Sequence, residues 1–193
     1  MCKFLSAIVM RSGDILCDPI NTDSHEDLLQ AHNIRDTDIQ SGRFARVEFT
    51  PPEDLTTIMD LSTWTLRVDE DSTPDWFDAV RVREDLSSRI QRMLITDHRE
   101  FLLGGCWILA GEGKVDTVKN TRIVSMHDTS QVRGMYGNSQ VVSMYDTSQV
   151  GSMDDNSQVV SMYDTSQVGR MDDTSQVGWM HGNARIINDL RKK

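Results

Sequence analysis

Residues 140–157 read Gln140-Val-Val-Ser-Met-Tyr-Asp-Thr-Ser-Gln-Val-Gly-Ser-Met-Asp-Asp-Asn-Ser157, which is two similar nine-residue units in tandem. The same unit recurs from Ile123 to Ile187 as Val-x-x-Met-x-Asp/Gly-Thr/Asn-Ser-Gln. The Met slot is filled at Met126, Met135, Met144, Met153, Met162, Met171 and Met180. Self-similarity at a fixed period indicates a stacked repeat architecture.

The composition of the unit favours strands over helices. Nine residues are too few for a helical repeat, which needs about 30, whereas Val and aromatic residues favour strands and Asp-Thr or Asp-Asn pairs favour turns. Val142 alternates with Gly151, and Tyr145 alternates with Asp154, so the full period is eighteen residues. The sequence therefore predicts a β-solenoid with eighteen residues per coil, from about residue 106 to 188. An antiparallel meander is the rival, but an odd period would swap the two faces of successive strands.

The repeat also predicts which side chains fill the solenoid. Residues eighteen apart should stack about 4.8 Å from each other, the ordinary spacing of paired strands. The Val and Met columns should then form the interior, with Met144, Met153 and Met162 buried. Side-chain amides are expected to bond along the stack in two columns, formed by Gln131, Gln149 and Gln167 and by Gln140, Gln158 and Gln176.

Residues 1–104 have a different pattern, which predicts a separate domain. Strands are expected near residues 4–10, 15–17, 44–49 and 64–68, with a short helix after Ser24 and a longer one from Pro74 to about Leu94. Val80, Leu86 and Ile90 would lie on the buried side of the longer helix. This ββαββα order predicts an α+β fold, namely a small two-layer domain over 1–104 followed by the solenoid over 105–193. Residues 182–193 depart from the repeat and are expected to cap its open end.

Charge and cysteine content restrict the partners and the compartment. Of the formal net charge of −10, residues 1–104 hold 20 acidic and 11 basic side chains, and residues 105–193 hold 10 and 9. An acidic surface disfavours direct binding to nucleic acid or to anionic membranes. Three cysteines, an odd number, argue against a disulfide framework and favour a reducing cytoplasm. Neither a signal peptide nor an apolar stretch long enough to span a membrane is apparent.

The solenoid carries the candidate binding residues, which are Tyr136, Tyr145, Tyr163 and Trp179. Aromatic side chains are enriched at protein interfaces, so these four predict a surface for a protein partner or for a second copy. Two other interpretations of the repeat stay open. Stacked Asp146 and Asp164 could hold a cation, although the Gly-Gly-x-Gly-x-Asp pattern of calcium-binding nonapeptides is absent. The Thr/Asn column loosely resembles ice-binding solenoids.

Several phrases resemble known groups of proteins. Met-Cys-Lys-Phe at residue 1, Ser-His-Glu-Asp-Leu at 24–28, Leu-Leu-Gly-Gly-Cys-Trp at 102–107 and the Ser-Gln-Val repeats are similar to uncharacterised proteins of phages and bacterial mobile elements. This resemblance implies a phage or mobile-element accessory protein in a bacterial cytoplasm. Such a protein could act by inhibiting a host factor. Gly-Asn-Ala-Arg-Ile at 182–186 is similar to units of left-handed hexapeptide solenoids.

One catalytic arrangement is an alternative. Met1-Cys2 followed by a hydrophobic strand resembles the start of class II glutamine amidotransferases, in which removal of Met leaves an N-terminal cysteine as nucleophile. His25, flanked by Asp23, could then assist Cys2 or Cys17. The chain lacks the Gly-Asn-Gly phrase and the spaced Arg and Asp that would bind glutamine, and it has no zinc spacing, phosphate loop or dinucleotide fingerprint. The sequence therefore favours a non-catalytic, cofactor-free interaction protein over an enzyme that uses Cys2.

Overall fold

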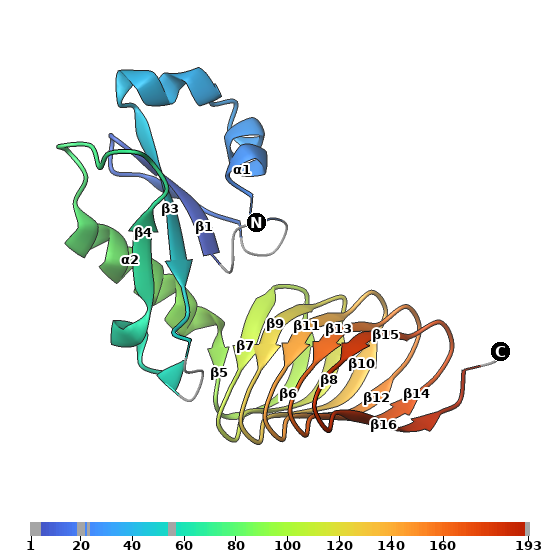
Figure 1. Ribbon diagram of the computed structural model, residues 1–193. Coiled ribbons are helices and arrows are strands. Elements are labelled where there is room, and N and C mark those ends of the chain that lie inside the picture. The colour runs from blue at the N-terminus through green and yellow to red at the C-terminus, as the bar shows by residue number, and fades with distance from the viewer. Residues whose placement is uncertain (1–4, 19–21, 23, 54–56, 192–193) are drawn as a thin grey trace. The chain divides into compact units, whose positions relative to one another are not determined.

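The computed structural model describes residues 5–18, 22, 24–53 and 57–191 and divides the chain into two compact units, Met1–Arg92 and Met93–Lys193 (Figure 1). The first unit is a small mixed α and β domain, and the second is a β-solenoid. This arrangement confirms the predicted α+β class.

The first unit is built on a four-stranded antiparallel sheet with the strand order β2-β1-β3-β4. The strands are β1 (Leu5–Met10), β2 (Ile15–Leu16), β3 (Phe44–Thr50) and β4 (Thr65–Val68). Its α-helices are α1 (His25–Ala31) and α2 (Ala79–Met93), and η1 (Asp36–Ser41) and η3 (Leu61–Thr63) are 3-10 helices. The order ββαββα is the one that the sequence predicts.

Helix α1 packs on this sheet through apolar side chains, and α2 contacts it through an arginine. Leu28 and Leu29 of α1 form a buried cluster with Ile8 and Phe44, while the guanidinium of Arg83 in α2 lies 5.7 Å from the centre of the Phe49 ring. Helix α2 starts at Ala79, several residues later than the predicted Pro74. Val82, Leu86, Ile90 and Met93 are buried, whereas the predicted Val80 is exposed.

The second unit coils between two six-stranded parallel sheets (Figure 1). One sheet has the order β16-β14-β12-β10-β8-β6 and the other has the order β15-β13-β11-β9-β7-β5. The strands are β5 (Leu94–Ile95), β6 (His98–Leu103), β7 (Cys106–Leu109), β8 (Lys114–Lys119), β9 (Arg122–Met126), β10 (Gln131–Tyr136), β11 (Gln140–Met144), β12 (Gln149–Met153), β13 (Gln158–Met162), β14 (Gln167–Met171), β15 (Gln176–Met180) and β16 (Arg185–Asp189).

The eighteen-residue coil is confirmed by the strand register. Val132 pairs with Val150, and Met144 pairs with Met162, in each case eighteen residues apart and in parallel. Val and Met fill one continuous core, in which Met144, Met153 and Met162 have no exposed surface. Neither a meander nor stacking at nine-residue intervals fits this register.

The solenoid begins earlier than the expected boundary at residue 105. Leu94 of β5 pairs in parallel with Ile108, and His98 of β6 pairs with Lys114, so both strands belong to the solenoid sheets. The offset from His98 to Lys114 is sixteen residues, and the offset from Lys114 to Gln131 is seventeen. Because these first coils are shorter than eighteen residues, a search for an exact period does not detect them.

The turns explain the Asp/Gly slot of the repeat. Asp128, Asp146 and Asp164 all have positive φ, and Gly137 takes the same conformation in an equivalent turn. Glycine adopts this left-handed region freely, and Asp tolerates it better than most residues. The carboxylate of Asp146 also accepts a hydrogen bond from the backbone N–H of Asp128, and Asp164 does the same for Asp146. Each turn is therefore fastened to the next coil.

The Ser-Gln pair works differently from the expected amide ladder. The Ser side chains are buried, and the backbone N–H of Gln149 donates to the carbonyl of Ser130 on the neighbouring coil. In the described part of the chain, no hydrogen bond joins the side chains of the stacked Gln residues. These side chains are partly or fully exposed in the structure, so water competes for their amides and the backbone joins the coils instead.

The C-terminal segment extends the sheet rather than folding over its end. Residues 185–189 form β16, whose Ile186 pairs with Val168 of β14. Within the described residues, Arg191 provides the capping contact that the sequence predicts. Its guanidinium donates to the carbonyl of Ser175 at 3.1 Å.

Candidate interaction surface at the open end of the solenoid

Two of the predicted aromatic residues lie in a continuous stack of rings along one corner of the solenoid. The rings of Tyr145 and Tyr163 are nearly parallel, with centroids 5.0 Å apart. His127 stacks on Tyr145 at 4.9 Å, and His181 stacks on Tyr163 at 5.1 Å. We call His127, Tyr145, Tyr163 and His181 the aromatic column. Its members follow the strands of one sheet at intervals of eighteen residues.

The two ends of the aromatic column differ in their environment. His127 is 1 % exposed, and both of its ring nitrogens lack a hydrogen-bond partner in the structure. Burial lowers the pKa of His127 to about 4, against an ordinary value of 6.5. Burial also raises the pKa of Tyr145. His181, at the other end, is exposed in the last coil, so the column ends in a ring that faces solvent.

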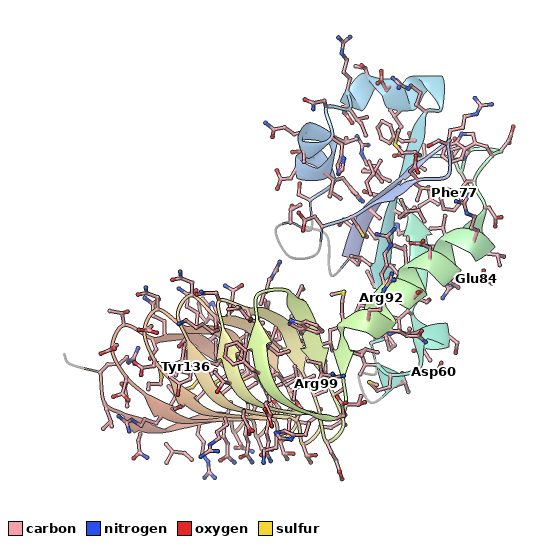
Figure 2. The ribbon with its side chains drawn as sticks, turned by 180° about the vertical axis from the view of Figure 1, so that it is seen from behind. Asp60, Phe77, Glu84, Arg92, Arg99 and Tyr136 are labelled. Carbon is pink, nitrogen blue, oxygen red and sulfur yellow. The ribbon has the colours of Figure 1, made fainter. Side chains whose placement is uncertain are left out.

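The structure does not bring all four predicted binding residues together. Tyr136 lies in β10, in the other sheet from the strands that precede Tyr145 and Tyr163 (Figure 2), and its ring lies against Gly134. Trp179 lies in β15, two residues before His181, and is 70 % exposed. Trp179 and His181, which is the exposed end of the aromatic column, therefore both lie in the last coil. Tyr136 lies in the other sheet and is not part of this group.

The last coil is also where the buried columns reach the surface. Met162 and Met171 have no exposed surface, whereas Met180, which follows Met162 by one coil, is 48 % exposed. Ile187 and Leu190 are likewise more than half exposed. We call Trp179, Met180, Ile187 and Leu190, together with the free edges of β15 and β16, the open-end surface. Among the described strands, β15 and β16 end their sheets, so apolar side chains and one edge of each strand face water here.

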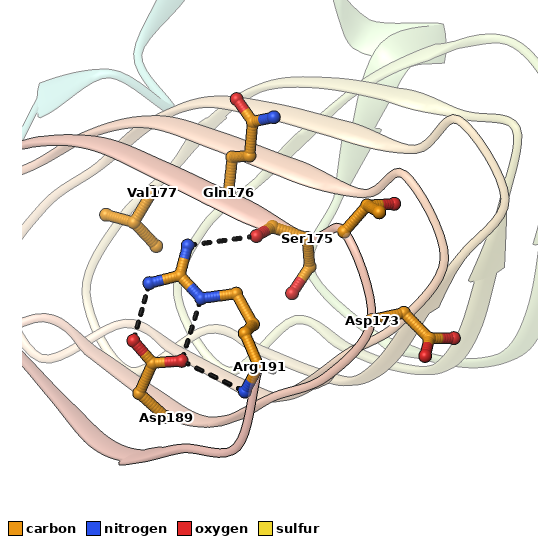
Figure 3. A pocket seen from close by; sticks show the side chains of 7 residues that line it. Asp173, Ser175, Gln176, Val177, Asp189 and Arg191 are labelled. Carbon is orange, nitrogen blue, oxygen red and sulfur yellow. Dashed lines mark hydrogen bonds and ion pairs between the residues drawn. The ribbon is translucent and has the colours of Figure 1, made fainter. Parts of the chain in front are cut away.

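The open-end surface is hollowed between its two edge strands. A depression of about 720 Å³ is lined by Asp173, Thr174, Ser175, Gln176, Val177, Asp189 and Arg191 (Figure 3). Within it, the guanidinium of Arg191 donates to the carboxylate of Asp189 at 2.7 Å from Nε and reaches the Ser175 carbonyl through Nη1. Arg191 is thus the polar group that spans the end of the core.

Acidic side chains gather beside this depression. One carboxylate oxygen from each of Asp154, Asp155 and Asp173 lies within 4.8 Å of the others. A hydrogen bond with Asp154 raises the pKa of Asp173. Asp155 also accepts a hydrogen bond from the backbone N–H of Gly137, so part of this cluster fastens adjacent coils in the same way as Asp146 and Asp164.

Sequence reasoning missed His127, His181, Ile187 and Leu190. The two histidines stand eighteen residues before Tyr145 and after Tyr163, so the period alone could have placed them in the same column. Ile187 and Leu190 were assigned to a cap. Their exposure depends on where the sheet stops, which local sequence does not show.

The residues of the catalytic alternative are only partly described. Cys2 and Asp23 lie outside the described residues. His25 is 7 % exposed, and its Nε2 lies 2.9 Å from the carbonyl oxygen of Val47, while Nδ1 lies 3.8 Å from Asp69. Burial raises the pKa of the Cys17 thiol, although Arg89 donates to its sulfur at 3.3 Å. A raised pKa makes the thiolate scarcer and Cys17 a weaker nucleophile.

Comparisons with known proteins give no match for this chain: no family model, no curated protein and no solved structure is similar to it at the threshold of significance. Among the described residues, no helix is both long enough and apolar enough to cross a membrane.

Proposed function

We propose that this chain is a non-catalytic interaction protein whose solenoid presents the open-end surface to a protein partner. The observation that carries the proposal is the concentration of exposed apolar side chains in the last coil, since Trp179 and Met180 occupy columns that are polar or buried in the preceding coils. Rigid aromatic side chains such as Trp contribute strongly to protein interfaces. The near-neutral solenoid does not repel an acidic or a basic partner.

The proposal also includes the class of partner and the cellular location. The resemblance of several motifs to phage and mobile-element proteins supports a bacterial host factor, or the chain itself, as the partner, and the odd cysteine count supports a cytoplasmic location. The acidic surface of residues 1–104 supports protein rather than nucleic acid as the bound molecule.

Capture of partners from a bacterial lysate tests the proposal with two full-length variants. Trp179→Ser removes the exposed ring and installs the residue found one coil earlier at Ser161, so we expect the fold to survive and the captured partner to be lost. Cys2→Ser removes the thiol of the catalytic alternative, and we expect capture to persist. Loss of the biological effect in a folded Cys2→Ser variant, or a covalent adduct on Cys2 seen by mass spectrometry, would instead support an enzyme.

A further inference from the structure

The buried Met column of one sheet ends in an acidic residue. In the sheet that ends at β16, Met153 pairs with Met171 and Met171 pairs with Asp189, so Asp189 occupies the next inward slot. Met153 and Met171 have no exposed surface. In the other sheet the same column ends in Met180. Because a buried carboxylate is costly unless it is paired, a further coil packed on Asp189 would have to enclose a charge.

Both oxygens of this carboxylate are held by one arginine. Nε of Arg191 donates to Oδ1 of Asp189 at 2.7 Å, and Nη2 donates to Oδ2 at 2.5 Å. This two-point geometry is the strong form of an Arg–carboxylate pair. The third nitrogen, Nη1, donates to the carbonyl of Ser175 at 3.1 Å (Figure 3). We call Asp189 and Arg191, joined by these bonds, the end clasp.

The Ser175 carbonyl corresponds to the group that joins each inner coil to the next. In the coil before it, the carbonyl of Ser166 accepts from the backbone N–H of Arg185 at 3.1 Å. The same bond joins the earlier coils in the pairs Gln149–Ser130, Gln158–Ser139, Gln167–Ser148 and Gln176–Ser157. At Ser175 a guanidinium nitrogen of Arg191 is the donor. Arg191 therefore takes the hydrogen-bonding position that the backbone of a further coil would use.

The repeat makes the end of the solenoid prone to add strands. Each inner strand pairs in parallel with a strand of nearly the same sequence, so a second copy of this chain carries strands of the kind that these sheets accept. An exposed edge is a template for such pairing. Ile187 and Leu190, on either side of Asp189 in the sequence, are 57 % and 55 % exposed, and apolar contact would favour the addition.

We propose that the end clasp is a stop, which prevents a strand of a second copy of this chain from adding to the end of the solenoid at β16. The added strand would have to displace Arg191 from Ser175 to form its own backbone bond, and Asp189 would then be enclosed without its partner. Natural proteins protect sheet edges with charges in this way. The stop does not depend on the proposed function, because it concerns the end of the β16 sheet and not the exposed side chains of β15.

Two substitutions remove the end clasp and continue the buried column. In the full-length chain, Asp189→Met with Arg191→Ala makes the end of this sheet apolar and frees the Ser175 carbonyl. We expect this clasp variant to fold, because Met is the residue of the same slot in the three preceding strands of the sheet, at Met135, Met153 and Met171.

Another Arg–Asp pair of the solenoid supplies a matched control. Nε of Arg170 lies 2.5 Å from a carboxylate oxygen of Asp172, and the Arg170 side chain is 57 % exposed. Arg170→Ala with Asp172→Met removes the same two charges and adds the same side chains. The control variant leaves the end clasp in place, so it measures the effect of the lost charges alone.

Sedimentation equilibrium over a range of concentrations measures self-association. We expect the clasp variant to associate with a dissociation constant at least about tenfold lower than that of wild type, because an apolar side chain replaces charges that oppose enclosure. The control variant should behave as wild type does. Equal self-association of wild type and the clasp variant would overturn the stop, and so would an equal gain in the control variant.

A second variant separates the loss of the clasp from the added apolar surface. Asp189→Asn with Arg191→Gln removes both charges and keeps polar side chains, so we expect it to fold as wild type does by circular dichroism. It should also self-associate more tightly than wild type, although less tightly than the clasp variant. No gain in this variant contradicts the stop, since a gain confined to the Met substitution would come from its apolar surface.

These results are separable from a failure of the proposed function. Capture of a partner by wild type and its loss in Trp179→Ser test β15, and the sedimentation comparison tests the end clasp. Either proposal can therefore fail while the other holds.

Discussion

At the scale of single residues, His127 links the stability of the solenoid to pH. Its pKa is about 4 in the folded chain against an ordinary value of 6.5. Between these two values the unfolded chain binds a proton that the folded chain does not, so stability falls as the pH falls. At about 1.4 kcal/mol for each pH unit, this histidine accounts for a loss of about 3 kcal/mol between pH 6.5 and pH 4.

His127→Tyr should remove this pH dependence, because Tyr fills the same slot at Tyr145 and Tyr163. Urea unfolding at pH 7 and at pH 4.5 measures the effect as the difference between wild type and variant, which cancels the contribution of other titrating groups. We expect the variant to lose less stability on acidification. An equal loss in both proteins would mean that His127 is protonated in the folded state.

A second prediction for a single residue concerns the core. Met153 has no exposed surface and lies between Met135 and Met171 in its sheet. Met153→Asp buries a carboxylate without a partner, and we expect a loss of about 3 kcal/mol or more in the free energy of unfolding. Gln149→Asp, on the exposed side of the same strand, should change stability by at most about 0.5 kcal/mol. Similar unfolding midpoints for the two variants would contradict the assigned interior.

At the scale of the element, the turns combine a backbone conformation with a hydrogen bond. Asp146 has a φ of 54° and accepts from the N–H of Asp128. Asp146→Ala should lose about 1 kcal/mol through backbone strain and about 1 kcal/mol through the lost hydrogen bond. Asp146→Gly should lose only the second part. Thermal or urea unfolding separates the two, and an Ala variant as stable as the Gly variant would show that strain is negligible here.

Sequence alone predicts an element well when the neighbouring elements repeat its sequence pattern. The strands from β9 to β15 follow from the period, because every coil has the same neighbours and the same Val and Met columns. The period did not reveal β5 and β6, whose partners lie at shorter offsets. In the first unit, Val80 was predicted on the buried side of α2, but Val82 is the residue spaced one turn before Leu86 on that side, and Val80 faces away from it. Sequence analysis predicted two members of the aromatic column, Tyr145 and Tyr163, and missed the other two, which are histidines.

At the scale of the whole molecule, the eighteen-residue coil predicts which deletions the chain tolerates. Removing residues 145–162 takes out one full coil and keeps His127 in register with Tyr163, so we expect a folded solenoid with somewhat lower stability. Removing residues 145–153 instead places Asp154 in the slot of Tyr145, which breaks the aromatic column. Circular dichroism and thermal unfolding compare the two, and equal stability would contradict a role for the column.

The close approach of neighbouring coils also limits which substitutions the solenoid tolerates. A Cβ atom at Gly169 would lie 2.4 Å from the carbonyl oxygen of Gly151, so a side chain at this position requires the backbone to move, although Val160 and Arg133 fill the same slot in other half-coils. The charged and aromatic variety of the repeat is found at outward-facing positions, such as Arg133 and Tyr136 in β10 and Arg170 in β14, and in the turns.

A coil that repeats almost unchanged allows the gene for this chain to vary in length. Nearly identical repeats misalign easily when DNA is copied or recombined, and a slip of two units inserts or deletes one coil while every ring, carboxylate and methionine keeps an equivalent neighbour. A slip of one unit would exchange the two corners of the following coils, so we expect it to disturb the fold. Populations that carry this gene are therefore expected to contain solenoids that differ by whole coils and share the same last strand.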